Sequence, residues 1–363
     1  MSYYKHELAA LKRAGRYRER RIFGDGIIDL ASNDYLGLAE NRTLFDAAVA
    51  RLEREKVHAP KASMLVNGYH TVHREFEAAL CEANGFEAGI VMGSGFNANI
   101  AMIEALVRRG DELFMDEKYH ASGMLASKLV EGKVTVFAHN DAEALEAKLK
   151  ASAAKRRIIA VEGIYSMDGD LMVPEIFAIA GQYDALLIVD EAHSSGVVGE
   201  KLLGVFDLYG ITPGPNHLKM GTLGKAYGSF GAYVLASQHI IDYLLNRAKP
   251  VIYATAPSLF DTALAHASLT YILNNSGMLS EKIRRRRRLA DEIFNQEIDG
   301  LIVALPVGDN REVVRIQAEL LEEGYLVGAI RQPTVKEAII RMIFRLGVDE
   351  ATTRTACRLI RQG

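Results

Sequence analysis

The sequence predicts an α/β protein, with a large, mostly parallel sheet covered by helices and a smaller α+β domain at the C-terminal end. Between residues 43 and 245, short apolar stretches alternate with segments whose apolar residues recur at helical spacing, which is typical of a parallel sheet with crossover helices. After about residue 240, a long helical region precedes three short strands and a last helix. With 363 residues, the chain exceeds the size at which one core usually stops growing, so two domains are expected.

Each element is predicted from its local pattern. The basic stretch 2–22 carries Leu8, Leu11 and Tyr17 on one side, which predicts an amphipathic helix. Strands are predicted at 27–30, 88–92, 112–115, 134–137, 158–162, 186–190, 231–236, 302–305, 325–329 and 339–344. Helices are predicted at 97–108, 142–150, 174–183 and over the long region 259–296. The resulting division is an N-terminal helix and arm (1–42), a large domain (43–245) and a small C-terminal domain (246–363).

Composition argues against several classes of protein. The formal net charge of -3 gives no general reason to expect nucleic acid or an anionic membrane, and no apolar run approaches the length of a membrane span. Five consecutive arginines, 284–288, are better explained as a solvated, salt-bridged helix, because Glu281, Asp291 and Glu292 lie within pairing distance along a helix. Cys81 and Cys357 suggest neither a disulfide framework nor a metal site, so a reducing cytoplasm is expected.

Two segments some thirty residues apart carry the strongest chemical signal. The first, 186–193, is an apolar strand that ends at Asp190 and is followed by His193. The second, 221–226, places Lys225 in a glycine-rich segment where its amine can be approached closely. A lysine that forms a Schiff base and an aspartate that faces a pyridinium nitrogen are the protein groups that pyridoxal 5'-phosphate (PLP) requires. The sequence therefore predicts a PLP site.

Each of these residues also has a simpler explanation. A single lysine is usually a solvated surface charge, and an aspartate after a strand is often a helix N-cap. His193 alone would more often be a structural histidine. The functional interpretation is favoured because the three residues occur together, and because ligands of parallel sheets lie beyond the carboxyl ends of the strands.

Other predicted strand ends also carry polar or glycine-flanked residues. Residues 93–99 (GSGFNAN) follow an apolar strand and open a helix, so Gly95 and Phe96 could offer free N–H groups to a phosphate. Thr222, three residues before Lys225, could add a hydroxyl. His120 could stack on the cofactor ring, and Ser166 supplies another hydroxyl. Each signal is weak alone, and together they favour one site at this edge of the sheet.

Seven segments together resemble the α-oxoamine synthase family of PLP-dependent enzymes of fold type I. They are 32–38 (SNDYLGL), 93–99 (GSGFNAN), 116–122 (DEKYHAS), 162–170 (EGIYSMDGD), 190–199 (DEAHSSGVVG), 221–228 (GTLGKAYG) and 331–335 (RQPTV). They span nearly the whole chain. The fold that this resemblance implies is the PLP-dependent transferase fold type I.

The resemblance also implies a role for each matched residue. Lys225 would hold PLP, and Asp190 would face the ring nitrogen. The other cofactor contacts would come from His193 and Ser166 (ring oxygen), Gly95, Phe96 and Thr222 (phosphate), His120 (ring stacking, catalysis and substrate positioning) and Thr255 (phosphate, across a dimer interface). Substrate would contact Arg18, Asn33, Arg331 and Thr334, as well as His120.

One position departs from the family pattern. The family usually has two arginines separated by one residue after this last motif, and the second binds the amino-acid carboxylate. Here the residues are Arg341 and Ile343, and an apolar side chain cannot replace a bidentate clamp. Arg341, Arg331 or another cation must substitute, or amino-acid affinity is low.

The resemblance is strongest to members that join L-alanine to a pimeloyl thioester, carried on coenzyme A or acyl carrier protein, in biotin biosynthesis. It implies a homodimer with the active site at the interface. The alternatives are a glycine- or serine-using member of the family, an aminotransferase of the same fold, and a non-catalytic partner subunit. Such subunits typically lack the lysine, and Lys225 is present.

Overall fold

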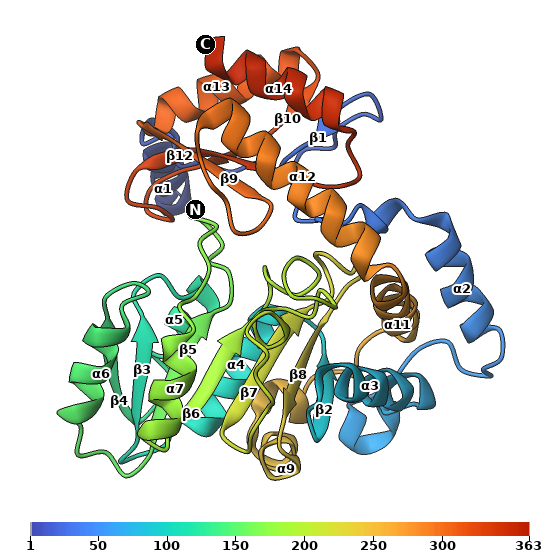
Figure 1. Ribbon diagram of the computed structural model, residues 1–363, viewed down its shortest axis with the longest axis vertical. Helices are drawn as coiled ribbons and strands as arrows, with labels where there is room; N and C mark the ends of the chain where they lie inside the picture. The colour runs from blue at the N-terminus through green and yellow to red at the C-terminus, as the bar shows by residue number, and fades with distance from the viewer. Residues whose placement is uncertain (1, 363) are drawn as a thin grey trace.

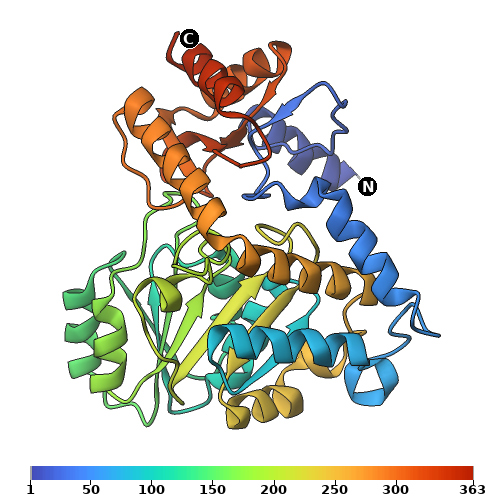
Figure 2. The same cartoon turned by 45° about the vertical axis from the view of Figure 1, so that its right-hand side comes forward.

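A computed structural model describes residues 2–362. Met1, the first residue of the predicted N-terminal arm, and Gly363, the last of the predicted C-terminal domain, lie outside the described residues. The chain forms a large α/β layer structure and a smaller α+β unit above it (Figure 1). Turned by 45°, the molecule shows helices α11 and α12 leading from the large unit to the small one (Figure 2). Within residues 2–362, no helix combines the length and apolar character needed to cross a membrane.

The large unit is built on a seven-stranded sheet with the order β2-β8-β7-β6-β5-β3-β4. Only β8 is antiparallel to its neighbours, so the sheet is mostly parallel, as predicted. The strands are β2 (Ala88–Met92), β3 (Glu112–Asp116), β4 (Lys133–Phe137), β5 (Arg157–Glu162), β6 (Leu186–Asp190), β7 (His217–Thr222) and β8 (Ala232–Ala236).

Alternation along the strands divides the core into two apolar layers. Val189 belongs to the core on one face of the sheet, whereas Ile188 belongs to the core on the other. The first face is covered by α3 (Thr71–Asn84), α6 (Ala142–Lys150) and α7 (Glu175–Gln182). The second is covered by α4 (Gly95–Leu106), α5 (Ala121–Ala126), α9 (Gln238–Arg247) and α10 (Lys249–Ile252).

The small unit has a three-stranded antiparallel sheet with the order β11-β12-β9. Its elements are α12 (Ser276–Phe294), β9 (Ile302–Gly308), α13 (Asn310–Glu322), β10 (Tyr325–Leu326), β11 (Gly328–Ile330), β12 (Ala338–Ile343) and α14 (Glu350–Gln362). The N-terminal strand β1 (Ile28–Asp29) pairs in parallel with β10, so the start of the chain lies against the small unit.

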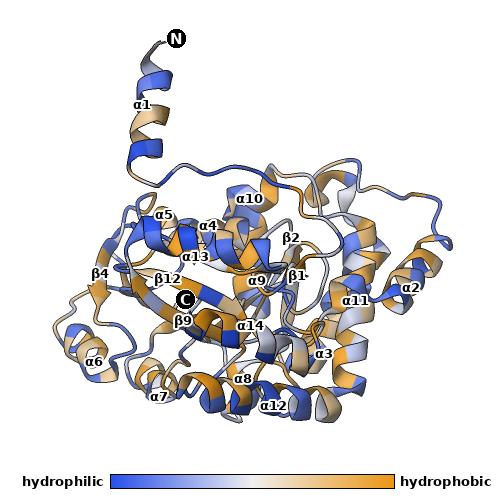
Figure 3. Cartoon of the chain, turned by 90° about the horizontal axis from the view of Figure 1, so that it is seen from above, coloured by the Kyte–Doolittle hydropathy of each residue, from blue (hydrophilic) through white to orange (hydrophobic). Residues whose placement is uncertain are grey.

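The remaining elements are short or peripheral: α1 (Ser2–Arg13), η1 (Leu38–Glu40), α2 (Arg42–Leu52), the π-helical turn η2 (Met64–Gly68), α8 (Val205–Leu208) and α11 (Leu259–Asn274). Helix α11 packs against α2 and α3. Helix α1 projects away from the body of the molecule (Figure 3). It ends well before residue 22, because Gly15 takes a left-handed conformation and closes the helix.

The structure differs from the sequence prediction in two further elements. The single helical region 259–296 is two helices, α11 and α12, which meet at Asn275. The central strand β7 was not predicted, because Lys219 interrupts its apolar pattern. Gly221 lies in this strand, where a Cβ would come 2.2 Å from the ring of Tyr233 on β8, so the glycine permits close packing there.

The arginine run is only partly the solvated face that was predicted. Arg284, Arg285 and Arg288 pair with Glu281 on the surface of α12. Arg286 is buried instead and donates a hydrogen bond to the carbonyl of Val348. The run therefore contributes to the packing of the small unit as well as to its surface.

A buried ion pair explains the lysine inside β7. The Lys219 amine lies 3.8 Å from Glu191 Oε1, and both side chains are fully buried. Lys219 also donates to Asn84 Oδ1 at 2.8 Å and to the carbonyl of Leu203. Glu191 accepts from the backbone N–H of Val205 at 2.9 Å. Because Glu191 directly follows Asp190, this pair fixes the backbone at the end of β6.

Removing one member of this pair should be costly. Lys219→Met leaves the Glu191 carboxylate buried without its cation, so we expect the free energy of unfolding to fall by about 3 kcal/mol. In the matched control Lys150→Met, the lysine side chain is 61% exposed and paired with Glu146. There we expect a much smaller loss, because an exposed ion pair contributes little to stability. Urea denaturation of both variants measures the difference, and equal losses would contradict the structural role of Lys219.

Candidate active site

The predicted site lies where β5, β6 and β7 end. Asp190 is the last residue of β6, and Glu162 is its register partner at the end of β5. Lys225 follows β7 in a turn closed by a hydrogen bond from the Gly228 N–H to the Lys225 carbonyl. Because these strands are parallel, their carboxyl ends meet at one edge of the sheet, below the small unit (Figure 1).

Asp190 is buried and held by two donors. Its Oδ1 accepts from the Ala192 N–H at 3.0 Å, and its Oδ2 accepts from Asn99 Nδ2 at 2.9 Å. Asn99 in turn accepts from the Tyr119 hydroxyl at 2.7 Å, which fixes the orientation of its amide. The Asp190 carboxylate therefore caps the turn that follows β6, which is the simpler role considered for it from the sequence. It also has a fixed orientation in the site. The part played by Asn99 was missed, although the sequence places it in the GSGFNAN segment.

The amine of Lys225 lies 2.7 Å from His193 Nε2. Burial lowers the pKa of Lys225 to about 8, and the nearby cation Arg341 acts in the same direction. Asp190 and Glu162 oppose that shift. At pH 7 about a tenth of this amine is therefore uncharged, far more than for an ordinary lysine, and the uncharged form is the one that attacks an aldehyde.

His193 is held between two partners. Its Nδ1 lies 2.5 Å from the Tyr35 hydroxyl, and its Nε2 faces Lys225. Burial, and then the charge of Lys225, places the pKa of His193 well below its ordinary value. His193 is therefore a neutral imidazole in this site.

Glu162 is a second buried carboxyl group beside Asp190. Burial, and then the negative charge of Asp190, raises the pKa of Glu162 well above its usual range. Its Oε2 accepts from the Ser166 N–H at 3.2 Å, whereas its Oε1 is buried with no hydrogen-bond partner among the described residues. Glu162 was not among the site residues predicted from the sequence.

The predicted phosphate contacts lie near one another. A Cβ on Gly95 would come 3.7 Å from Thr222 Cβ, so the first turn of α4 lies beside the end of β7. The Ser94 hydroxyl caps the Asn97 N–H, which leaves the N–H groups of Gly95 and Phe96 without helical partners. The Thr222 hydroxyl donates to the Gly231 carbonyl at 3.1 Å. This corner can bind an anion through backbone N–H groups and a hydroxyl.

His120 and Ser166 adjoin the same cluster. His120 is the N-cap of α5, where its Nδ1 lies 2.6 Å from the Ser122 hydroxyl. Burial lowers the pKa of His120, and the charges of Asp190 and Lys225 also act on it. The buried Ser166 is held at both ends of its backbone, by Glu162 and by Arg341.

Arg341 lies at the site, whereas Ile343 does not. Its Nε donates to the Ser166 carbonyl at 2.8 Å, and its Nη1 donates to Asn33 Oδ1 at 3.1 Å. Its Nη2 is buried with no hydrogen-bond partner among the described residues. Ile343 belongs to the apolar core. The structure thus brings Asn33 and Arg341 together at the site, with one donor still free.

The other predicted substrate contacts lie farther out. Arg331 donates to the backbone carbonyls of Gly15 and Tyr17, at 2.7 and 3.2 Å, so it holds the N-terminal arm. Burial, and then the positive charge of Arg18, lowers the pKa of Arg331, which indicates that the two arginines are neighbours. Thr334 and Thr255 are exposed. Within residues 2–362, no side-chain hydrogen bond joins either threonine to the cluster around Lys225.

The loop that carries Ser166 is fixed by a charged histidine. His139 lies 3.0 Å from Asp116 Oδ1 and 2.8 Å from Asp170 Oδ2, and its ring packs edge-on against Tyr165. Burial would lower the pKa of His139, but the hydrogen bonds to the two carboxylates outweigh it and raise that pKa to about 9. Asp168, near this cluster, pairs with Lys118 at 2.8 Å. These carboxylates are therefore neutralised by side-chain cations.

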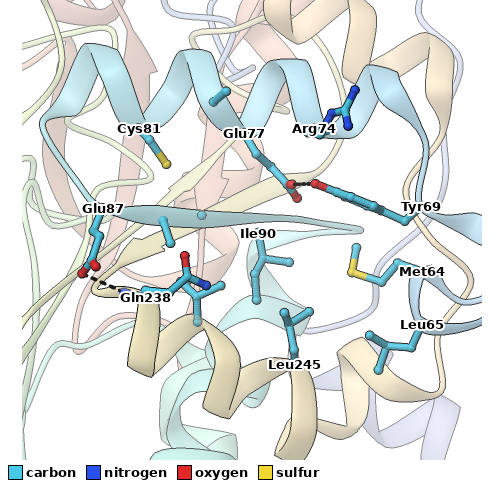
Figure 4. A pocket seen from close by; sticks show the side chains of 14 residues that line it. Met64, Leu65, Tyr69, Arg74, Glu77, Cys81, Glu87, Ile90, Gln238 and Leu245 are labelled. Carbon is cyan, nitrogen blue, oxygen red and sulfur yellow. Dashed lines mark hydrogen bonds between the residues drawn. The ribbon is translucent and has the colours of Figure 1, made fainter.

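A well-formed cavity lies elsewhere. It has a volume of about 400 Å³ and lies between η2, α3, β2 and α9 (Figure 4). Glu77 is one of its polar lining residues and accepts a hydrogen bond from the Tyr69 hydroxyl at 2.5 Å. None of its lining residues belongs to the cluster around Lys225.

The arrangement around Lys225 fits PLP. A buried amine with a lowered pKa can bind an aldehyde covalently, and Asp190 can hold a pyridine nitrogen protonated. The first turn of α4 and Thr222 can bind a phosphate. The free Nη2 of Arg341 is a donor without an acceptor, which suits an anionic substrate.

Comparisons with known proteins agree with this chemistry. The family model described as aminotransferase class I and II matches residues 25–360. An 8-amino-7-oxononanoate synthase of Helicobacter pylori (strain ATCC 700392 / 26695) is 41% identical over 345 residues, which cover 94% of this chain and 92% of the relative. One from Herminiimonas arsenicoxydans is 37% identical over 357 residues, covering 93% and 92%.

Solved structures show the same fold. Serine palmitoyltransferase from S. paucimobilis with a bound PLP–myriocin aldimine superposes with a TM-score of 0.89 and 22% identity, covering 99% of this chain and 96% of that one. An 8-amino-7-oxononanoate synthase from Francisella tularensis gives a TM-score of 0.75 and 25% identity, covering 93% and 98%.

The His139 cluster predicts a pH-dependent stability. Its folded pKa is raised above the unfolded value of about 6.5, so its contribution is complete below pH 6.5 and is lost as the pH rises through about 9. After allowance for solvent screening, the loss should be roughly 2 kcal/mol. Urea denaturation should show the gap between the wild type and His139→Gln shrinking by this amount from pH 6 to pH 9.5. For the exposed control His239→Gln the gap should stay flat, and a flat gap for His139 would contradict the charged cluster.

Proposed function

This chain belongs to the aminotransferase class I and II family, and within it to the PLP-dependent α-oxoamine synthases, and on that basis we propose that it joins L-alanine to a pimeloyl thioester. The product would be 8-amino-7-oxononanoate, the compound that names its relatives in biotin biosynthesis. In this reaction the alanine Cα bonds to the thioester carbonyl carbon, the C–S bond breaks to release the thiol, and the bond to the alanine carboxyl carbon breaks to release carbon dioxide.

One observation carries the proposal: the half-buried Lys225 amine lies 2.7 Å from His193 Nε2 and within electrostatic reach of Asp190. When bound, PLP supplies an aldehyde for covalent attachment and an electron-withdrawing ring. Asp190, fixed by Asn99, would keep the ring nitrogen protonated. Lys225 would hold the cofactor and, once released from it, would take the α-proton of alanine.

The other cofactor contacts follow from position. His193 and Ser166 would donate to the ring oxygen, and His120 would stack on the ring. The N–H groups of Gly95 and Phe96, together with the Thr222 hydroxyl, would bind the phosphate. These roles rest on the family motifs and on the proximity of the side chains described above.

We assign the amino-acid carboxylate to Arg341. Its guanidinium is buried, anchored on Ser166 and Asn33, and has one free donor. Arg331 already binds backbone carbonyls of the arm, and with Arg18 it forms a cationic pair. We therefore propose that Arg18, Arg331 and Thr334 contact the pimeloyl thioester. Coenzyme A and acyl carrier protein are both suitable carriers, because each is a polyanion.

A homodimer would complete the site. Leu65, Val66 and Tyr69 are exposed around η2, and Tyr253 is 79% exposed beside it. The Ser63 hydroxyl donates to the Ile252 carbonyl at 2.9 Å, so these two loops form one apolar surface next to Thr255 and to the cavity of Figure 4. A second copy on this surface would bury it and bring Thr255 to the partner's phosphate site. The two free cysteines fit the reducing cytoplasm as its location.

The function is tested by supplying the purified protein with PLP and with pimeloyl thioesters of coenzyme A and of acyl carrier protein. Alanine, glycine and serine are each added, and thiol release and product mass are measured. We expect thiol release with alanine and a product equal to pimelate plus alanine minus carbon dioxide and water. Lys225→Ala should abolish turnover and the visible absorbance of the bound cofactor, whereas the exposed control Lys201→Ala should keep both.

Other outcomes identify the alternatives. Thiol release with glycine or serine alone would contradict the substrate proposal and indicate another α-oxoamine synthase. Transfer of the amino group to a 2-oxo acid without thiol release would indicate an aminotransferase.

The carboxylate assignment predicts a selective defect. Arg341→Met should raise KM for alanine by about 100-fold, because the charge-assisted hydrogen bond from the free Nη2 to the carboxylate is lost. The absorbance of the bound cofactor should persist, since Arg341 does not hold the cofactor. Arg331→Met should change KM for the thioester instead. Steady-state kinetics of both variants decides the assignment, which fails if Arg331→Met has the larger effect on alanine.

A further inference from the structure

Tyr35 is a buried polar residue beside His193. It lies in the segment between β1 and η1, and its relative exposure is 0%. Its ring packs edge-on against His193, with 6.0 Å between ring centroids and an interplanar angle of 70°. A residue that only filled this core position could be phenylalanine, so the hydroxyl requires its own explanation.

The hydroxyl begins a chain of hydrogen bonds that ends at the reactive amine. It lies 2.5 Å from His193 Nδ1, and His193 Nε2 lies 2.7 Å from Lys225 Nζ. Its other neighbour, Asn33 Oδ1, is 3.5 Å away and already accepts from Arg341. Tyr35 is thus strongly bonded to His193 and only weakly to Asn33.

These distances select one arrangement of protons. Burial raises the pKa of Tyr35 to about 12, so its hydroxyl keeps its proton and can donate it. Donation to His193 Nδ1 requires that the single proton of the neutral ring lie on Nε2, where it points at Lys225. The opposite tautomer would force the tyrosine proton toward Asn33, across 3.5 Å and onto an oxygen that is already bonded.

The Nε2–H tautomer suits an uncharged amine. A ring N–H can donate to the lone pair of a neutral Lys225, whereas it would oppose an ammonium group, which has donors only. The other groups that face the pair are Arg341 and His120, which act on His193, and Asp190, Glu162 and Arg341, which act on Lys225. The charges of Asp190 and Glu162 favour the ammonium form of Lys225. The Nε2–H tautomer of His193 acts in the other direction, because it favours the uncharged amine.

We propose that Tyr35 is a positioning residue: it holds His193 as the Nε2–H tautomer and thereby favours the uncharged form of the Lys225 amine, which captures the cofactor aldehyde. This inference rests on the proposed role of Lys225, but it concerns the protein before the cofactor is bound. Its test therefore needs neither alanine nor a thioester, and its failure would leave the substrate proposal untouched.

The first test measures cofactor capture by protein stripped of PLP. The rate constant, followed by visible absorbance from pH 6 to pH 10, should rise with a midpoint near pH 8 in the wild type. In Tyr35→Phe, one buried hydrogen bond that favours the neutral amine is lost. The midpoint should rise by about 0.7 pH unit, so that capture at pH 7 is about fivefold slower.

The control is Tyr209→Phe, which removes a tyrosine hydroxyl bonded to the Met172 carbonyl at 2.6 Å, away from the cluster. Its midpoint should match the wild type. An unchanged midpoint in Tyr35→Phe, or an equal shift in both variants, would overturn the proposal.

The second test needs no variant of Tyr35. Nitrogen-15 NMR of histidine-labelled protein without PLP reports which ring nitrogen carries the proton, and the His193 signal is identified by its loss in His193→Asn. The proposal requires Nε2–H in the wild type at pH 9, above the pKa of about 8 of the Lys225 amine. Observation of Nδ1–H, or of a charged ring, would overturn it even if Tyr35→Phe did not fold.

Discussion

The amine of Lys225 is half-buried at the edge of the large sheet, and its protonation depends on a few fixed neighbours. Burial disfavours its charge, while Asp190 and Glu162 favour it. Burial and the neighbouring Asp190 raise the pKa of Glu162, while Asp190 accepts hydrogen bonds from the Ala192 N–H and the Asn99 amide. The chemistry proposed for the site depends on this balance.

The surrounding structure holds these groups in place. The Lys219–Glu191 pair fixes the chain after Asp190, and the His139 cluster fixes the loop that carries Ser166. Arg345 of the small unit pairs with Asp29 at 3.0 Å and with Asp34 at 2.8 Å. These ion pairs connect the N-terminal segment, the sheet edge and the small unit. As a result, Asn33, Tyr35 and Arg341 can reach a site built mainly from the large sheet.

The local sequence pattern predicted an element correctly where a single physical rule decides its structure. Apolar runs between turn signals predicted six of the seven strands in the large sheet, because strands covered by helices on both faces must be apolar. It failed at β7, where a buried ion pair replaces apolar packing and puts Lys219 in the strand. It also extended the first helix too far, since the left-handed Gly15 outweighs the amphipathic pattern beyond it.

The sequence by itself determined the fold class and the cofactor, and it predicted Asp190, His193 and Lys225 as one cluster, because they occur in short motifs whose spacing reflects strand ends. Only the tertiary structure decided that Arg341 contacts Ser166 and Asn33, that Glu162 is buried beside Asp190, and that Tyr35 contacts His193. These relations join residues as far apart as Asn33 and Arg341. Their proximity is set by the packing of the small unit on the sheet, and their protonation by burial, neither of which is written in any local stretch of the chain.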